Sequence, residues 1–160
     1  SHYSGVRQKV RESRELDRSE VRRRLRAAAE HAMGLPSATP RVASVGFCWG
    51  GRTSFDFATA YPGLDGAVVY YGTPPDDEAL ARIEAPVLGL YGGNDNRVTS
   101  TVPATEETME ELGKVYTTHV YEGAGHGFLR AQDGQEGANM EATRQAWPTT
   151  VEFFRAVLGG

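Results

Sequence analysis

Four short apolar runs alternate with helix-like stretches along this chain of 160 residues. The runs cover residues 41–47, 66–72, 86–91 and 115–121, and each has the length of one strand. The second run is almost continuously apolar, which is typical of a parallel strand covered on both faces. Because helical patterns separate successive strands, the chain is predicted to be an α/β protein with a mostly parallel sheet and helices on both faces.

The first predicted helix begins at Asp17, which stands three residues before Glu20 in the spacing of a capping box. Apolar residues follow at helical intervals until Gly34 and Pro36 end the helix. Several arginines lie on its other faces; a solvated helix surface is a more economical interpretation of them than a nucleic-acid site. Residues 1–16 are polar and basic, and we expect a loop or a poorly ordered segment there.

The remaining helices are expected after each strand. They cover about 52–61, 77–83, 103–112 and 139–158. The third of these has a proline at its start and Gly113 at its end, as helices often do. Pro148 is expected to kink the last helix or to begin a second one.

Composition fits one globular domain over residues 1–160, with 39% apolar and 24% charged residues. A net charge of −4 argues against nucleic acid or an anionic membrane as a partner, and no apolar run is long enough to span a bilayer. A single cysteine excludes an intrachain disulfide and a Cys-rich zinc site. No metal-ligand spacing is present, so we expect no metal or other cofactor. The chain starts at Ser1 without Met, so the natural N-terminus is expected to be absent, and a cytoplasmic location is assumed only by default.

The single cysteine, Cys48, stands in Gly46-Phe47-Cys48-Trp49-Gly50-Gly51, between a predicted strand and a predicted helix. Small flanking residues allow a strand to turn sharply into a helix and lift one side chain out at the apex. This pattern predicts the nucleophile elbow of α/β-hydrolases, with a thiol in place of the usual hydroxyl. The alternative is that Cys48 is a small buried apolar residue.

Asp95 and His126, like Cys48, directly follow predicted strands, and the carboxyl ends of parallel strands meet at one crevice. The chain order nucleophile, acid, histidine is that of α/β-hydrolases. His126 would take the proton of the thiol and Asp95 would orient the imidazole, while the Trp49 N–H would donate to an oxyanion. The alternative for Asp95 is a loop cap.

Four motifs together resemble the dienelactone hydrolase (carboxymethylenebutenolidase) family. They are residues 46–51, 70–72, 91–95 and 123–128. The resemblance implies an α/β-hydrolase fold and a Cys48-Asp95-His126 triad that opens a lactone or a small carboxylic ester. It also implies that Arg130 binds a substrate carboxylate and that Tyr70 lines the site; a surface ion pair and a core position are the respective alternatives.

Family members also have a front half before the elbow, with strands, a helix and a loop that gives the second oxyanion donor. The 47 residues that precede Cys48 here are too few for that half. The chain therefore resembles the C-terminal portion of such a hydrolase, with the N-terminal strands supplied by a second chain or another segment and an open sheet edge without them. The alternatives are a non-catalytic fragment that acts as an interaction subunit, and a thioesterase or peptidase on the same scaffold.

Overall fold

The computed structural model describes residues 17–159, so the expectation for residues 1–16 lies outside the described part. The chain divides into two compact units at Pro40 and Arg41. The described part of the first unit contains the predicted helix, α2 (Arg18–Met33), and the Asp17 side chain accepts a hydrogen bond from the Ser19 amide at 3.2 Å. Glu20 does not complete the capping box; hydrogen bonds from two following arginines instead lower the pKa of its carboxyl to about 2.

The second unit is built on four parallel strands in chain order. They are β1 (Ala43–Phe47), β2 (Gly66–Tyr70), β3 (Val87–Gly92) and β4 (Tyr116–Tyr121). Every residue of β2 and β3 is buried, as expected of parallel strands covered on both faces. The sequence placed all four strands correctly, although the second apolar run outlasts β2 by two residues.

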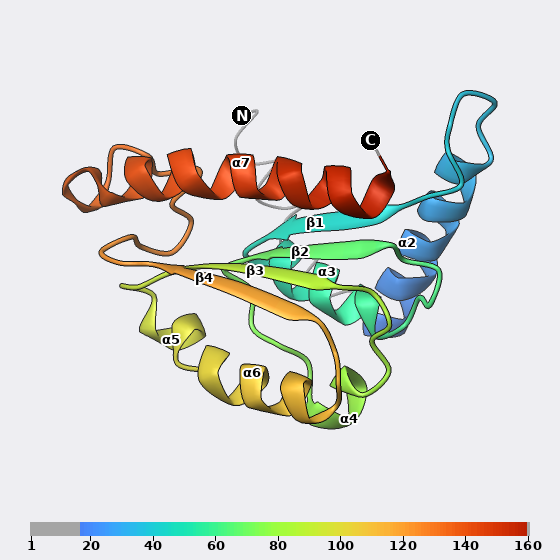
Figure 1. Cartoon of the computed structure of the whole chain (residues 1–160), viewed down its shortest axis with the longest axis horizontal. Coiled ribbons are helices and arrows are strands. Elements are labelled where there is room, and N and C mark those ends of the chain that lie inside the picture. The colour runs from blue at the N-terminus through green and yellow to red at the C-terminus, as the bar shows by residue number, and fades with distance from the viewer. Residues whose placement is uncertain (1–16, 160) are drawn as a thin grey trace. The chain divides into compact units, whose positions relative to one another are not determined.

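Helices cover both faces of this sheet, which confirms the predicted architecture (Figure 1). One face carries α3 (Trp49–Ala58), α4 (Asp77–Leu80), α5 (Asn96–Thr99) and α6 (Val102–Glu111). The other carries α7 (Ala138–Leu158), which a 3-10 turn at Gln135–Gly137 precedes. Pro148 lies within α7 and does not begin a second helix, so that alternative was wrong.

The core on the α7 face brings large side chains of the sheet against small ones of the helix. Leu88, Leu90 and Tyr70 are buried there with Ala142 and Ala146. The two alanines, one turn apart, let α7 approach the sheet closely. The Tyr70 hydroxyl reaches the helix itself, at 2.7 Å from the Thr150 hydroxyl and 3.2 Å from a backbone carbonyl.

Strand β1 forms one edge of the described sheet and is less completely covered on its α7 face than on its α3 face. On the α3 face, the Ser44 and Ser54 hydroxyls are 2.8 Å apart, and a Cβ on Gly46 would overlap the Gly50 backbone. On the α7 face, Val45 is 43% and Phe47 42% exposed. Within the second unit, β1 thus has one unpaired edge and an apolar face that is only partly covered.

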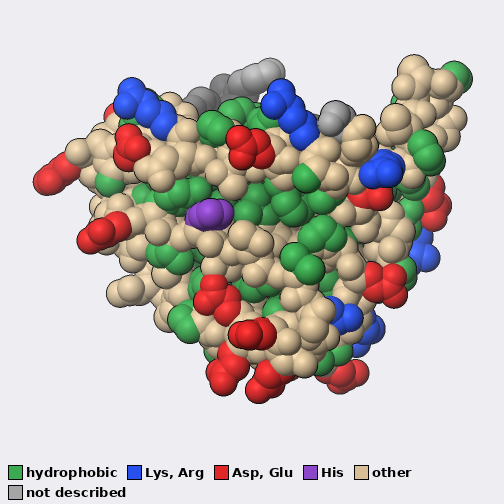
Figure 2. Space-filling model, viewed as in Figure 1, with side chains coloured by type: hydrophobic (Ala, Val, Ile, Leu, Met, Phe, Trp, Pro, Cys, Tyr) green, Lys and Arg blue, Asp and Glu red, His purple; other side chains and the backbone are tan. Residues whose placement is uncertain are grey.

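Acidic side chains gather over α4 and α6, on the face of the sheet opposite α7 (Figure 2). Between these helices and α7, Figure 2 shows a band of apolar side chains across the sheet. Within residues 17–159, no helix has the length and apolar character needed to cross a membrane.

Candidate active site

Cys48 stands at a sharp turn between β1 and α3, as the sequence predicted. Its backbone is left-handed, with φ 55° and ψ −114°, a costly conformation for a residue other than glycine. Glycine neighbours make the turn possible, because a Cβ on Gly51 would overlap the Tyr70 carbonyl. The turn is tied to β2 by a 3.1 Å hydrogen bond from the Cys48 amide to that carbonyl. The sheet thus holds the thiol out at the carboxyl end of β1.

Trp49 is the first residue of α3 and directly follows the thiol-bearing residue. The amides of the first turn of a helix have no acceptor within the helix, and they lie at the positive end of its dipole. The Trp49 N–H is therefore suited to donate a hydrogen bond to a carbonyl oxygen that becomes negatively charged when the Cys48 sulfur attacks its carbon.

Asp95 and His126 meet at the ends of β3 and β4. The His126 Nδ1 lies 2.5 Å from Asp95 Oδ2, and the carboxylate is buried while the imidazole is 36% exposed. Backbone hydrogen bonds join the two loops: Gly93 donates to the Tyr121 carbonyl at 2.8 Å and Asn94 to the Ala124 carbonyl at 2.9 Å. The Asp95 side chain makes no capping bond to α5, so the alternative of a loop cap is not what the structure shows.

Tyr71 lies beside His126 in the site, although the sequence analysis did not select it. It is 3% exposed, has a left-handed φ of 40°, and its ring centre lies 5.1 Å from that of His126. Burial raises the pKa of its phenol, the charge of a nearby Cys48 thiolate raises it further, and Arg130 partly opposes both. The hydroxyl therefore stays protonated at neutral pH and is available as a donor.

Tyr70, expected to line the site, lies in the core instead. It is fully buried, and its hydroxyl is engaged with α7. The physical reason is that β2 ends at Tyr70, so the first residue beyond the strand end is Tyr71. The rule that selected Cys48, Asp95 and His126, namely position just past a strand end, would also have selected Tyr71.

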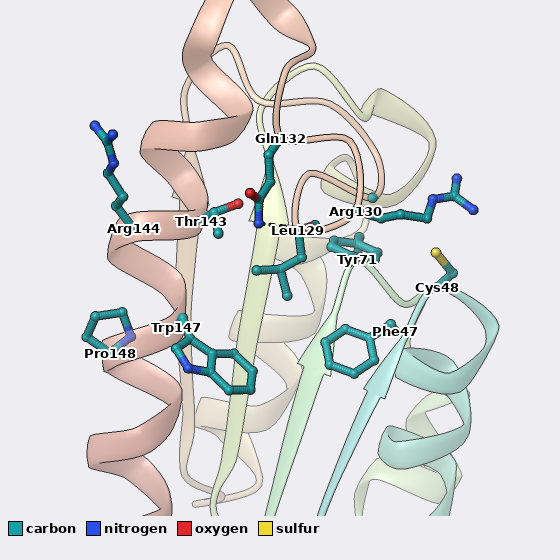
Figure 3. A pocket seen from close by; sticks show the side chains of 11 residues that line it. Phe47, Cys48, Tyr71, Leu129, Arg130, Gln132, Thr143, Arg144, Trp147 and Pro148 are labelled. Atoms are coloured by element: carbon teal, nitrogen blue, oxygen red, sulfur yellow. Dashed lines mark hydrogen bonds between the residues drawn. The ribbon is translucent and has the colours of Figure 1, made fainter.

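A cavity of about 830 Å³ opens beside Cys48. It is lined by Phe47, Cys48, Tyr71, Gly127, Leu129, Arg130, Gln132, Thr143, Arg144, Trp147 and Pro148. Figure 3 shows Cys48, Tyr71 and Arg130 together at one end of the cavity, with Leu129 beside Tyr71 and with Phe47 and Trp147 below. The Arg144 side chain points away from Cys48 on the far side of α7. The cavity thus has an apolar body and one cationic end next to the thiol.

Leu129 and Trp147 could not be predicted as lining residues, because they come from a loop and from α7 and only the fold brings them to Phe47. Trp147 is 51% exposed although it lies on the helix that covers the core. Within the described residues, no group of three or more His, Cys, Asp or Glu side chains gathers as a metal-ligand set.

The family model of the dienelactone hydrolases matches residues 4–158, almost the whole chain. The chain belongs to the dienelactone hydrolase family. Curated relatives agree: the chain is 36% identical over 118 residues to a Saccharolobus solfataricus protein named "Putative carboxymethylenebutenolidase", a match over 73% of this chain and 45% of the relative. It is 31% identical over 118 residues to the mouse "Carboxymethylenebutenolidase homolog", over 71% of this chain and 47% of that protein.

Among solved structures, one similar to this dienelactone hydrolase-family chain is a Klebsiella pneumoniae protein described as "Putative Dienelactone Hydrolase". Its TM-score is 0.78 at 26% identity, over 89% of this chain and 63% of that one. Together with the parallel sheet and its helices, this likeness establishes the α/β-hydrolase fold. The chain spans about half the length of the curated relatives that it matches.

Proposed function

We propose that this chain carries the catalytic residues of a hydrolase that cleaves a lactone or small carboxylic ester, with Cys48 as the nucleophile. The observation that carries the proposal is the 2.5 Å contact between His126 and a buried Asp95, beside the cavity at which Cys48 is held out by the turn. Membership of the dienelactone hydrolase family supports the same chemistry.

In the proposed mechanism, Asp95 holds His126 with Nδ1 toward it, which leaves Nε2 as the acceptor of the thiol proton. The Cys48 thiolate attacks the ester carbonyl, and the Trp49 N–H stabilises the oxyanion. The tetrahedral intermediate collapses to a thioester as the C–O bond breaks, and His126 returns its proton to the leaving alcohol or ring oxygen. A water molecule, deprotonated by His126, then attacks the thioester and frees the thiol.

Arg130 is proposed to bind a carboxylate of the substrate. Its guanidinium lies at the Cys48 end of the cavity, close enough to the Tyr71 hydroxyl to influence that pKa. A guanidinium fork fits a carboxylate through two parallel hydrogen bonds, and the protonated phenol of Tyr71 can donate a third. The preferred substrate would therefore be an ester or lactone with an apolar body and a carboxylate near the scissile bond.

We further propose that additional polypeptide, on the same protein or a second chain, completes the sheet at β1. Successive crossovers from β1 to β4 keep their helices on the α3 face, because parallel connections are right-handed. If added strands beside β1 were joined in the opposite direction, away from β2, a right-handed connection would place its helix on the α7 face. Val45 and Phe47 are exposed on that face. The added segment would also be the source of a second oxyanion donor beside Trp49.

Turnover of p-nitrophenyl acetate before and after alkylation of Cys48 by iodoacetamide tests the nucleophile. Loss of turnover in proportion to alkylation supports the proposal, and turnover that survives complete alkylation excludes the thiol. Absence of turnover in the unmodified protein, with its complementing segment present, would favour the non-catalytic interaction subunit. A thioesterase or peptidase would share the triad, and a comparison of ester, thioester and peptide substrates distinguishes them.

The natural protein's intact mass and N-terminal sequence test the completion of the sheet. We expect further polypeptide that copurifies with, or is continuous with, this chain. A single species of 17.4 kDa that hydrolyses an activated ester by itself would contradict it.

A further inference from the structure

Asn139 is the second residue of α7, and its side chain is buried. Its amide group makes one hydrogen bond to each end of the segment that contains His126 and Arg130. Asn139 is 3% exposed. Its Oδ1 accepts from the Gly125 amide at 2.8 Å, and its Nδ2 donates to the Ala131 carbonyl at 2.7 Å. Gly125 directly precedes His126, and Ala131 directly follows Arg130. One side chain thus satisfies both ends of a loop that holds two residues of the site.

The chain enters α7 in a way that aims Asn139 back at this loop. Three consecutive residues, Gln135, Glu136 and Gly137, are left-handed, with φ of 55°, 52° and 95°. Two of them are not glycine, so the surrounding structure must hold this costly conformation in place. The fit around the amide is tight, because a Cβ on Gly134 would lie 2.9 Å from Asn139 Nδ2.

The Asn139 side chain does not act as a cap of its own helix. The residue before α7 makes no side-chain capping bond, and both hydrogen bonds of the Asn139 amide group go to the loop of residues 125–131. Loss of the Asn139 amide would leave the Gly125 N–H without this acceptor, and the Ala131 carbonyl would keep only its bond from the Gly134 amide at 3.0 Å. The loop would then lose two of the contacts that determine where His126 and Arg130 lie.

We propose that Asn139 is a positioning residue that holds His126 through Gly125 and Arg130 through Ala131. The proposal rests on the proposed function for its effect on turnover, and it goes further in assigning a role to a residue outside the cavity. The two hydrogen bonds have separable consequences: the bond to Gly125 acts on the acid–base residue, and the bond to Ala131 acts on the carboxylate-binding residue.

Two variants separate these roles, and a third serves as a control. Asn139→Leu removes both hydrogen bonds at nearly constant volume, while Asn139→Asp keeps an acceptor for Gly125 and loses the donor to Ala131. Thr150→Val removes a buried hydroxyl from the same helix that bonds only within α7 and to Tyr70. Thr150→Val therefore also loses buried hydrogen bonds of α7, as the Asn139 variants do, but it leaves the loop of residues 125–131 unchanged.

The readouts are kcat and KM for a neutral and a carboxylate-bearing ester, the thermal midpoint, and the His126 Nδ1–H signal in NMR of 15N-histidine-labelled protein. Asn139→Leu should lower kcat on both esters by on the order of 10²-fold, the cost of a small misplacement of a catalytic group, and should broaden or shift the His126 signal. Asn139→Asp should keep that signal and raise KM about tenfold on the carboxylate-bearing ester alone, as expected when displacement of Arg130 costs one hydrogen bond to the substrate carboxylate. Thr150→Val should lower only the thermal midpoint.

An Asn139→Leu protein with the His126 signal of the wild type, and a kcat within twofold of Thr150→Val, would overturn the proposal. If Asn139→Leu does not fold, Asn139→Asp decides: an unchanged KM for the carboxylate-bearing ester overturns the role toward Arg130. If the wild type has no turnover, the proposed function fails, and the NMR signal decides alone. Its loss in Asn139→Leu but not in Thr150→Val would still support the positioning of His126.

Discussion

Adjacent tyrosines at the end of β2 should respond in opposite ways to loss of their hydroxyls. Tyr70→Phe removes a fully buried hydroxyl that contacts the Thr150 hydroxyl and the Ala146 carbonyl. Thr150 still donates to that carbonyl at 2.9 Å, so no buried group is left unpaired. The cost should therefore be that of an ordinary net hydrogen bond, about 1 kcal/mol in the free energy of unfolding, with unchanged turnover.

For Tyr71→Phe we expect the reverse. Tyr71 lines the cavity, and its phenol is close enough to Arg130 for that charge to affect its pKa, so the free energy of unfolding should change little. The KM for a carboxylate-bearing ester should rise about tenfold, because a donor to a charged group is lost, while kcat stays within a few-fold. The pKa of this phenol is raised, so the effect on KM should be constant from pH 6 to about pH 9.

Urea unfolding and ester kinetics on both variants check these expectations. At about 1 kcal/mol, Tyr70→Phe should lower the thermal midpoint by roughly 2–4 °C for a domain of this size. A Tyr70→Phe protein with raised KM and normal stability, beside a Tyr71→Phe protein with normal KM and reduced stability, would refute the assignment of Tyr70 to the core and Tyr71 to the site.

Other consequences can be measured on the same protein. Cys48→Ala should abolish ester turnover and leave the circular dichroism spectrum unchanged; residual turnover above that of buffer would argue for another nucleophile. Asp95→Asn should lower kcat by less than Cys48→Ala does, because His126 remains present but loses its carboxylate partner. Arg130→Ala should raise KM for carboxylate-bearing esters only, and an equal loss on neutral esters would contradict its role. Burial raises the pKa of Tyr91 and of Tyr121 to about 12, so stability gained from keeping both neutral should be present below pH 10 and fall as pH rises toward 12. These two phenols alone should lower the free energy of unfolding by up to ~2.7 kcal/mol per pH unit between these values, which urea titrations at pH 9 and 11 would detect.

The strands and most helices could be predicted because each has a local pattern. Strands β2 and β3 are apolar throughout, and the helices have apolar residues at helical spacing with glycine or proline at their ends. The short helix α5 has only four residues, too few for any periodicity, and it was missed. Pro148 is tolerated within α7 because it lies on the exposed side, where solvent can satisfy the carbonyl that loses its partner.

The reactive residues of the site could be predicted from the sequence better than the residues that form its cavity. Asp95 and His126 were paired correctly because both follow strands in a parallel sheet, and position past a strand end is a local feature. The residues of the cavity wall could not be predicted from the sequence, because Phe47 and Trp147 are brought together only by the packing of α7 on the sheet. Asn139 was missed for the same reason: its partners Gly125 and Ala131 are contacts of the folded chain.

The end of the sheet beneath the site is closed by a continuous row of backbone hydrogen bonds. The Cys48 amide bonds to β2, the Tyr71 amide to the Leu90 carbonyl of β3 at 2.9 Å, and the Gly93 amide to the Tyr121 carbonyl of β4. These amides should exchange with solvent only through opening of the sheet itself, among the slowest in the protein. We therefore expect the backbone beneath the site to be rigid. Any motion that admits substrate and releases product is then expected at the cavity entrance, where Arg130 and Trp147 lie.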